Sequence, residues 1–268
     1  MELDPYKLVN HVKDATAFEF PLGYEWELPK ILGFQITKFM VLELAVAVLM
    51  LLIFVPMARR LSDGRPPKGR FWNMFDAMFL FLRNEVVRPA MGHHEADRFL
   101  PLICSFFFFI LLCNLMGLLP WMGSPTASIN GTGPLAVIAF VVGVGAGMKK
   151  YGRWHFWLGL CPPMEVPLIL KIFLVPMIIG LEIVGLVIRF GVLAVRLLAN
   201  MFGGHFVLAM IIGFIPAMAA SLLWWGVAPL AVFGAVAISL LEILIAFLHA
   251  YIFSFLAALF IGMCIHQH

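Results

Sequence analysis

Charged residues are scarce in this chain of 268 residues, of which 12% are Asp, Glu, Lys or Arg and 63% are hydrophobic. A soluble domain of this length carries about 25% charged residues. The shortage excludes an ordinary soluble protein and predicts an all-α polytopic membrane protein embedded in a lipid bilayer. The formal net charge of +3 is small, indicates little about partners, and gives no reason to expect a nucleic acid among them.

Cysteine is also rare, and its spacing excludes two further kinds of site. The four cysteines form no C-x-x-C pair, and most lie in apolar runs: Cys104, Cys113, Cys161 and Cys264. We expect buried thiols, with neither a disulfide framework nor a zinc site. The polar stretch 91–98 holds two adjacent histidines and two acids on a predicted loop. These histidines lack the i, i+4 spacing of ligands on one helix face, so we expect neither a metal nor a cofactor.

Sequence motifs typical of other functional classes are missing as well. No H-E-x-x-H motif, G-x-S-x-G motif or aspartate pair occurs at membrane depth, which argues against an intramembrane enzyme. We find no convincing internal repeat of the kind common in secondary transporters. Residues 1–28 mix charges without a central apolar core, unlike a secretory signal. We expect residues 1–35 to form a polar N-terminal segment.

What the chain does have is long apolar stretches, which we assign to one membrane domain, residues 36–268. A helix needs about 20 apolar residues to cross the hydrocarbon core. The predicted spans are 36–57, 99–120, 130–148, 165–213 and 222–263. In the third, Gly143 and Gly147 form a small-xxx-small pair that predicts the close approach of another helix. Residues 71–87 instead predict an amphipathic helix at the membrane interface, because apolar residues recur there at helical spacing among charges.

The distribution of positive charge predicts the orientation. Two loops are rich in lysine and arginine: Arg59, Arg60, Arg65, Lys68 and Arg70 after the first span, and Lys149, Lys150 and Arg153 after the third. The loop from Trp121 to Gly133 holds no charge. Because positive loops stay on the cytoplasmic side, we expect the N-terminus outside and the C-terminus in the cytoplasm.

The stretch 165–213 is too long for a single upright span. As one helix it would measure roughly 70 Å, against a hydrocarbon core of about 30 Å. Glu182, Arg189 and Arg196 are each seven residues apart, which keeps them on one helix face. A turn would have no reason to preserve that register, so we predict one long tilted helix.

The stretch 222–263 repeats this pattern. Glu242 and His249 are seven residues apart, so its polar residues also keep one face. We predict a second long tilted helix, joined to the first near Ile215–Pro216. The two would form a hairpin whose polar stripes face protein or water.

Arg196 is the most demanding residue in the first of these helices. A guanidinium near the middle of a membrane helix costs roughly 2.5–3.5 kcal/mol. It could extend to the headgroups, pair inside the bundle, or have a function. Asn200 follows one turn later on the same face, whereas His205 lies on nearly the opposite face. Asn114, in the outer third of the second span, could line a pathway or hydrogen-bond between helices.

The polar residues of the two long helices and their neighbours resemble those of a known protein family. The segment Arg196-Leu-Leu-Ala-Asn200-Met-Phe-Gly-Gly-His205 closely resembles the signature helix of subunit a of F-type ATP synthases. The resemblance extends over most of the chain. It includes Asn114-Leu-Met-Gly-Leu-Leu-Pro120, the charged positions Glu182 and Arg189, Glu242, and His249-Ala-Tyr-Ile-Phe253.

The resemblance implies an ion-translocating stator without a catalytic site of its own. The long hairpin would lie against a rotating ring of c subunits, and two offset proton half-channels would meet that ring. The outer half-channel would involve Asn114, His205 and Glu242, and the inner one would open near Glu182. Arg196 would separate them and favour ionisation of a ring carboxylate. Peripheral-stalk b-type subunits and the other ATP synthase subunits would be further partners, in a bacterial inner membrane.

The sequence departs from the family's usual pattern in three places. Many relatives have an acid at 205 and a histidine at 242, and here the two types are exchanged. Gly117 stands where some relatives have an aspartate. His249 replaces a usual glutamine close to Arg196, so it is either a relay or a positioning residue. The alternative function is a self-contained secondary ion transporter that relays protons through Glu182, Glu242 and His205.

Overall fold

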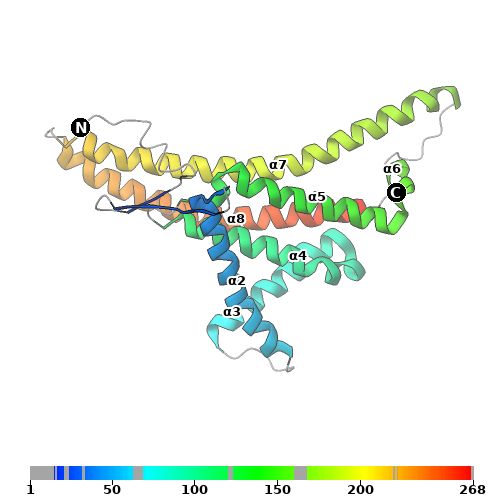
Figure 1. Cartoon of the computed structure of the whole chain (residues 1–268), viewed down its shortest axis with the longest axis horizontal. Helices are drawn as coiled ribbons and strands as arrows, with labels where there is room; N and C mark the ends of the chain where they lie inside the picture. Colours follow the sequence, from blue (N-terminus) through cyan, green and yellow to red (C-terminus); the bar gives the residue numbers. More distant parts are fainter. Residues whose placement is uncertain are drawn as a thin grey trace. The chain divides into compact units, whose positions relative to one another are not determined.

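The computed structural model describes residues 15, 17–20, 24–31, 34–62, 69–119, 123–159, 168–219, 221 and 223–266. The elements of these residues are mostly helical (Figure 1). In chain order the helices are α2 (Lys38–Ser62), α3 (Arg70–Phe81), the π-helical segment η1 (Leu82–Val87), α4 (Arg88–Gly117), the 3₁₀ turn η2 (Pro125–Ala127), α5 (Ile129–Tyr151), α6 (Arg153–Gly159), α7 (Leu168–Ala217) and α8 (Trp224–Ile265).

Five of these helices are long and apolar enough to cross a membrane, which confirms the predicted fold class. Their spanning segments are Lys38–Arg59, Glu95–Gly117, Ile129–Tyr151, Phe173–Ala217 and Trp224–Ile265. The last two helices contain 50 and 42 residues, so each long apolar stretch is one helix, as the seven-residue register predicted. The helix α7 is therefore about 75 Å long. The turn between α7 and α8 follows Ala217, two residues beyond the predicted joint.

The N-terminal segment contains strands that the sequence analysis did not predict. β1 (Ala17–Phe20) pairs antiparallel with β2 (Tyr24–Glu27), and β3 (Lys30–Ile31) pairs with β4 (Phe34–Gln35). In the first pair the register sets Phe18 opposite Trp26 and Phe20 opposite Tyr24. Aromatic residues alternate with glutamate in β2, and this period of two is the signal that a sequence reading could have used.

The amphipathic helix is present, but the loop predicted after it is not. Phe75, Leu82 and Val86 are buried on one face of α3 and η1, as their spacing predicted. The polar stretch 91–98 then continues inside α4, with a kink at Gly92 (φ 76°, ψ 164°). A positive φ is accessible to glycine without strain, so the chain changes direction there and resumes its helix at once. The adjacent histidines therefore lie on a helix, not on a loop.

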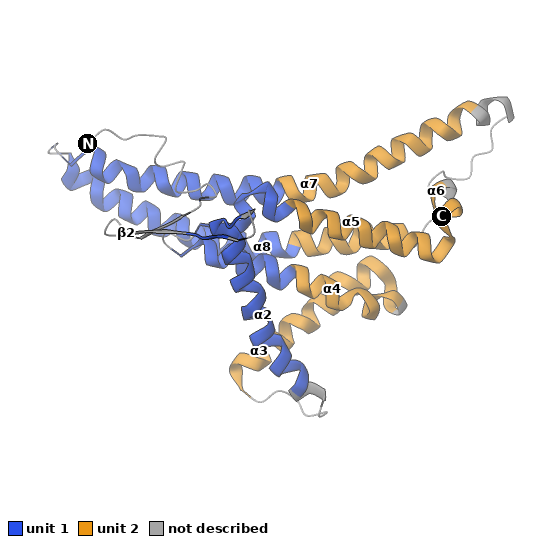
Figure 2. Cartoon of the chain, in the orientation of Figure 1, with its two compact units in different colours: residues 1–66, 107–132, 196–251 blue, residues 67–106, 133–195, 252–268 orange. Residues whose placement is uncertain are grey.

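The chain divides into two compact units (Figure 2), which we describe separately. Unit 1 comprises residues 1–66, 107–132 and 196–251, and unit 2 comprises residues 67–106, 133–195 and 252–268. The helices α4, α7 and α8 each contribute one part of their length to each unit.

Small residues allow close helix packing in both units. In unit 2, a Cβ at Gly147 would lie 2.7 Å from the carbonyl oxygen of Cys264, and one at Gly143 would meet Ile261. The predicted close approach at these glycines is therefore confirmed, with α8 as the neighbour of α5. In unit 1, Met201 of α7 packs with Ala127 and with Ala246 of α8. We call these three residues the Met201 cluster.

The described cysteines lie in apolar surroundings, as predicted. Cys104, Cys113 and Cys264 are buried free thiols. Cys161 lies outside the described residues.

Candidate functional site

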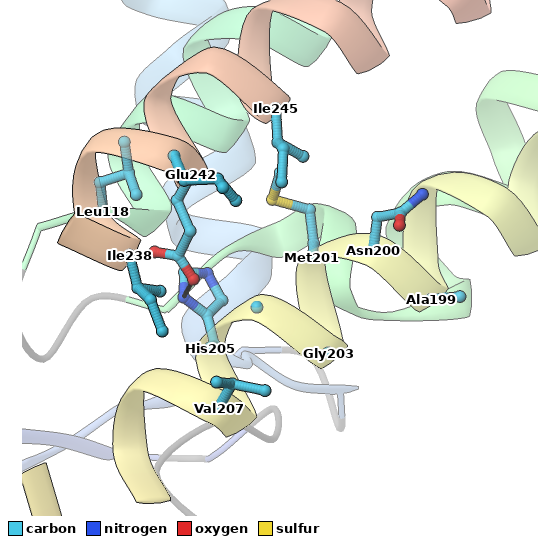
Figure 3. Close-up of a pocket in the computed structure, with 12 residues that line it drawn as sticks. Leu118, Ala199, Asn200, Met201, Gly203, His205, Val207, Ile238, Glu242 and Ile245 are labelled. Carbon is cyan, nitrogen blue, oxygen red and sulfur yellow. Dashed lines mark ion pairs between the residues drawn. The ribbon is translucent and has the colours of Figure 1, made fainter. Parts of the chain in front are cut away.

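The centre of the site is an acid–base pair between the two long helices in unit 1. His205 of α7 and Glu242 of α8 point toward each other (Figure 3), with His205 Nδ1 3.9 Å from Glu242 Oε1. Their side chains are only 11% and 6% exposed. A Cβ at Gly204 would lie 2.7 Å from Glu242 Oε1. Glycine at position 204 thus gives the carboxylate the space that it occupies beside α7.

The pair lines a cavity of about 380 Å³. Asn200, Gly203 and Ile245 also line this cavity, together with Leu118, which directly follows α4. Both carboxylate oxygens of Glu242 and the Nε2 atom of His205 are buried without a hydrogen-bond partner among the described residues. Buried polar atoms in native proteins nearly always have partners, in the protein or in ordered water. A cavity of this size has room for several waters, each of which occupies about 30 Å³, and the unpartnered atoms of His205 and Glu242 would hold them.

A second polar arrangement lies one turn earlier on α7. The Asn200 side-chain amide donates to the carbonyl oxygen of Arg196 at 3.0 Å and also contacts His249 Nε2. His249 Nδ1 lies 2.8 Å from the carbonyl oxygen of Ile245. Because a carbonyl can only accept, His249 Nδ1 carries the proton and donates it there. His249 Nε2 then accepts from Asn200, so both ring nitrogens have a partner.

Arg196 is exposed on the surface of α7. Its guanidinium makes no hydrogen bond or ion pair with the described residues of unit 1. The two charged residues that precede it in register pair with each other in unit 2, where Arg189 lies 3.4 Å from Glu182. Thus the three charged residues at seven-residue spacing comprise one ion pair, Glu182 with Arg189, and one cation, Arg196, that is available to another chain.

Asn114 does not line the cavity around the acid–base pair. It is fully buried in unit 1, donates to the carbonyl oxygen of Ala246 at 3.3 Å, and accepts from Thr126 Oγ1 at 2.6 Å. Asn114 therefore hydrogen-bonds between helices, which was one of the two alternatives considered from the sequence. Thr126 in turn shares a hydrogen bond of 2.6 Å with Ser124.

Ser124 and Thr126 were missed by the sequence analysis, which treated residues 121–133 only as an uncharged outer loop. Both are buried, with exposed fractions of 0% and 1%. Ser124 also occupies the space that a side chain at Gly117 would need. An aspartate at this position, as in some relatives, would displace Ser124. No residue pattern in the loop marks it as buried, because its burial depends on the contact with α4.

Residues 40–262 match the family described as ATP synthase A chain. The chain belongs to the ATP synthase subunit a family. The match spans the first membrane helix through most of the last one, so it includes every side chain of the site.

Relatives support the same assignment. The chain is 38% identical to ATP synthase subunit a of Chloroherpeton thalassium, over 98% of this chain and 78% of the relative. It is 34% identical to ATP synthase subunit a 2 of Chlorobaculum tepidum, over 96% and 72%. It is 32% identical to ATP synthase subunit a of Anaeromyxobacter dehalogenans, over 97% and 70%. Together with the five apolar helices, this makes the chain an integral membrane subunit of a bacterial F-type ATP synthase, in which it belongs to the stator and takes part in proton transport.

Proposed function

We propose that this subunit a forms two offset proton half-channels against the ring of c subunits, with Arg196 between them. The observation that carries the proposal is the state of Arg196: exposed on α7, and without a counter-charge among the described residues of unit 1. An unpaired guanidinium within the hydrocarbon costs roughly 2.5–3.5 kcal/mol. A carboxylate on a neighbouring chain would remove this cost, and a ring carboxylate fits that requirement.

The surface around Arg196 favours a close partner. Ala199 and Asn200 are exposed on the same face, and no atom lies within 4 Å of the position that a Cβ at Gly203 would take. Small side chains let helix backbones approach closely in membranes. A ring helix could therefore pack along this face and bring its carboxylate to the guanidinium. The fixed positive charge would favour the ionised carboxylate, so the arriving site would release its proton.

The outer half-channel would end at the cavity of His205 and Glu242. Their three unpartnered polar atoms would be hydrated, and the pair would accept a proton from this water and hand it to the ring. One acid and one base in contact can exchange a proton in either arrangement. The exchange of residue types relative to many members of the family therefore leaves the chemistry of the pair intact. Asn114 would serve this half-channel indirectly, by fixing the buried loop of Ser124 and Thr126 against α8.

The inner half-channel would open near Glu182. Its side chain is 34% exposed beside Arg189, so the carboxylate is accessible from the surface of the subunit. His249 would position the Arg196 turn through Asn200 in place of the family's glutamine. In this arrangement the N-terminus lies outside and the C-terminus in the cytoplasm, and the c-ring and b-type stalk subunits are the neighbours in the complex.

Substitution of Arg196 tests the proposal. Lysine keeps the charge, but a desolvated ammonium can lose its proton and lacks the planar fork of donors. We expect Arg196→Lys to abolish coupled ATP synthesis, and Arg196→Ala to let protons pass between the half-channels without synthesis. Proton conductance and ATP synthesis are measured in vesicles that hold equal amounts of assembled complex, with Arg153→Ala as a control that removes a cation outside the spans.

Near-normal synthesis by assembled Arg196→Lys would refute the role as a separator. The secondary-transporter alternative makes a different prediction, since a self-contained transporter would conduct ions without a ring. Co-purification with an oligomeric c-type ring, and no conductance by the isolated chain, support the stator.

A further inference from the structure

A second polar cavity lies in unit 2, at the ends of three membrane spans. It has a volume of about 230 Å³. The span of α4 begins beside it, at Glu95, and the spans of α5 and α8 end beside it, at Tyr151 and Ile265. None of its lining residues belongs to the proposed proton path.

The cavity is strongly positive. Arg98, Lys149 and Lys150 line it together with a single acid, Glu95, which leaves a net charge of +2 from three cations and one carboxylate. None of these four side chains has an ion pair with another described residue. Cations gathered in one cavity repel each other, and an anion between them would replace repulsion by attraction.

The walls of the cavity are partly apolar. Phe99 and Ile265 are buried, with exposed fractions of 7% and 2%, and both line it. The Arg98 guanidinium lies over the Phe99 ring, 5.5 Å from its centroid, and the Lys150 ammonium lies 5.8 Å from the centroid of Tyr151. Aromatic faces attract cations and hold these two charges at the level where the spans end. The fitting ligand is one that joins an anionic group to an apolar body at a membrane surface.

We propose that this cavity binds the headgroup of an anionic phospholipid, with its phosphate between Arg98, Lys149 and Lys150. Basic pockets between membrane helices on the cytoplasmic side have this property in general. The volume of 230 Å³ lies below the roughly 300–1,000 Å³ of pockets for drug-sized ligands. It therefore suits a single headgroup better than a folded segment of another protein.

Glu95 narrows the choice of headgroup. A carboxylate opposes a phosphate but accepts a hydrogen bond from a hydroxyl. A headgroup that carries both phosphate and hydroxyl, as phosphatidylglycerol does, satisfies the cations and Glu95 together. Phosphatidic acid and free inorganic phosphate lack an alcohol hydroxyl at a distance from the phosphate, and phosphatidylethanolamine is zwitterionic, which does not balance a charge of +2.

The test uses the purified ATP synthase complex, stripped of loosely held lipid by detergent and then supplied with phosphatidylglycerol, phosphatidic acid, phosphatidylethanolamine or inorganic phosphate. Bound molecules per complex are counted by native mass spectrometry. Arg98→Gln and the double variant Lys149→Gln/Lys150→Gln are compared with Arg153→Gln, which removes an exposed cation at the start of α6 that does not line the cavity. A photoreactive phosphatidylglycerol applied to the unmodified complex locates the ligand independently of any variant.

We expect phosphatidylglycerol to bind tightest, with a loss of affinity of about fivefold for each cation removed and none in Arg153→Gln. Glu95→Ala should abolish the preference for phosphatidylglycerol over phosphatidic acid. The photoreactive lipid should label peptides that contain Phe99 or Ala146. Equal binding by the cavity variants and Arg153→Gln would overturn the proposal. So would labelling elsewhere, equal competition by inorganic phosphate, or cross-linking of the cavity to an acidic segment of another subunit.

Discussion

Exchange of the two members of the acid–base pair is the sharpest test of the outer half-channel. At 3.9 Å, the charged forms of His205 and Glu242 would attract by about 4 kcal/mol at an effective dielectric constant of about 20. Loss of one partner from a buried pair costs about 3–5 kcal/mol, because the other charge is left uncompensated. Because a positioned acid or base typically contributes about 10²–10⁴-fold to the rate of a proton transfer, we also expect His205→Ala and Glu242→Ala each to lower proton-driven ATP synthesis by at least about 100-fold.

The double variant His205→Glu with Glu242→His restores one acid and one base at the same two positions. The glycine at 204 leaves room beside residue 242, so we expect synthesis to recover to within about tenfold of the unmodified complex. The two changes should show a coupling free energy of about 1–3 kcal/mol. The assay is ATP synthesis driven by an imposed proton gradient in vesicles with equal amounts of assembled complex.

A matched control keeps the composition and breaks the contact. Glu242→His with His249→Glu also supplies one new histidine and one new acid, but the acid stands two turns away on α8 and does not face His205. We expect no recovery there. If the true exchange gives no more synthesis than the worse of its two single changes, the pairing of 205 with 242 has no role in proton transfer.

Three further outcomes follow from the contacts around the site. His249→Gln should keep most of the ATP synthesis activity, because an amide can also accept from Asn200, and near-complete loss of proton pumping would instead make the imidazole a relay. Asn114→Leu should lower the stability of the subunit by about 1–3 kcal/mol, since it removes the buried hydrogen bonds of Asn114 to Thr126 and to the Ala246 carbonyl, while Asn114→Asp should lower proton pumping less than Asn114→Leu does; thermal unfolding of the assembled complex and pumping assays compare the two variants, and equal stability of Asn114→Leu and the unmodified complex would contradict the structural role. Gly204→Val should displace the Glu242 carboxylate, which a Cβ alone would already approach to 2.7 Å, and should reduce synthesis without opening a leak; full synthesis would mean that the carboxylate is free to move elsewhere.

The elements that the sequence predicted well are those with a sustained periodic signal. Glu182, Arg189 and Arg196 keep one register across a stretch where two spans would need a turn, and α7 is indeed unbroken through it. Phe75 and Val86 recur at helical spacing and are buried together. In both cases the helical period alone constrains the structure, so no knowledge of tertiary contacts is needed.

The elements that the sequence predicted poorly depend on contacts between distant parts of the chain. The burial of Ser124 and Thr126 requires the space left by Gly117. The local sequence pattern does not predict this burial. The kink at Gly92 replaced an expected loop because one glycine with a positive φ joins two helical segments directly, with no further residues between them. The sequence placed His205 and Asn200 on different faces of α7. It could not give the distance to Glu242, because that depends on how α8 packs against α7.

The Met201 cluster separates two polar regions that are close neighbours along α7. Figure 3 draws Met201 between Asn200 on one side and the His205–Glu242 pair on the other. Met201, at 5% exposure, and Ala246, at 0%, offer no group that can carry a proton between them. The side chains of the cluster thus offer no direct link between the two regions. In the proposed function, a proton on Glu242 could approach the turn that holds Arg196 only through water in the cavity, which Asn200 also lines. In the proposed function, transfer from Glu242 would therefore depend on that water or on a ring carboxylate, and not on a relay of side chains within the subunit.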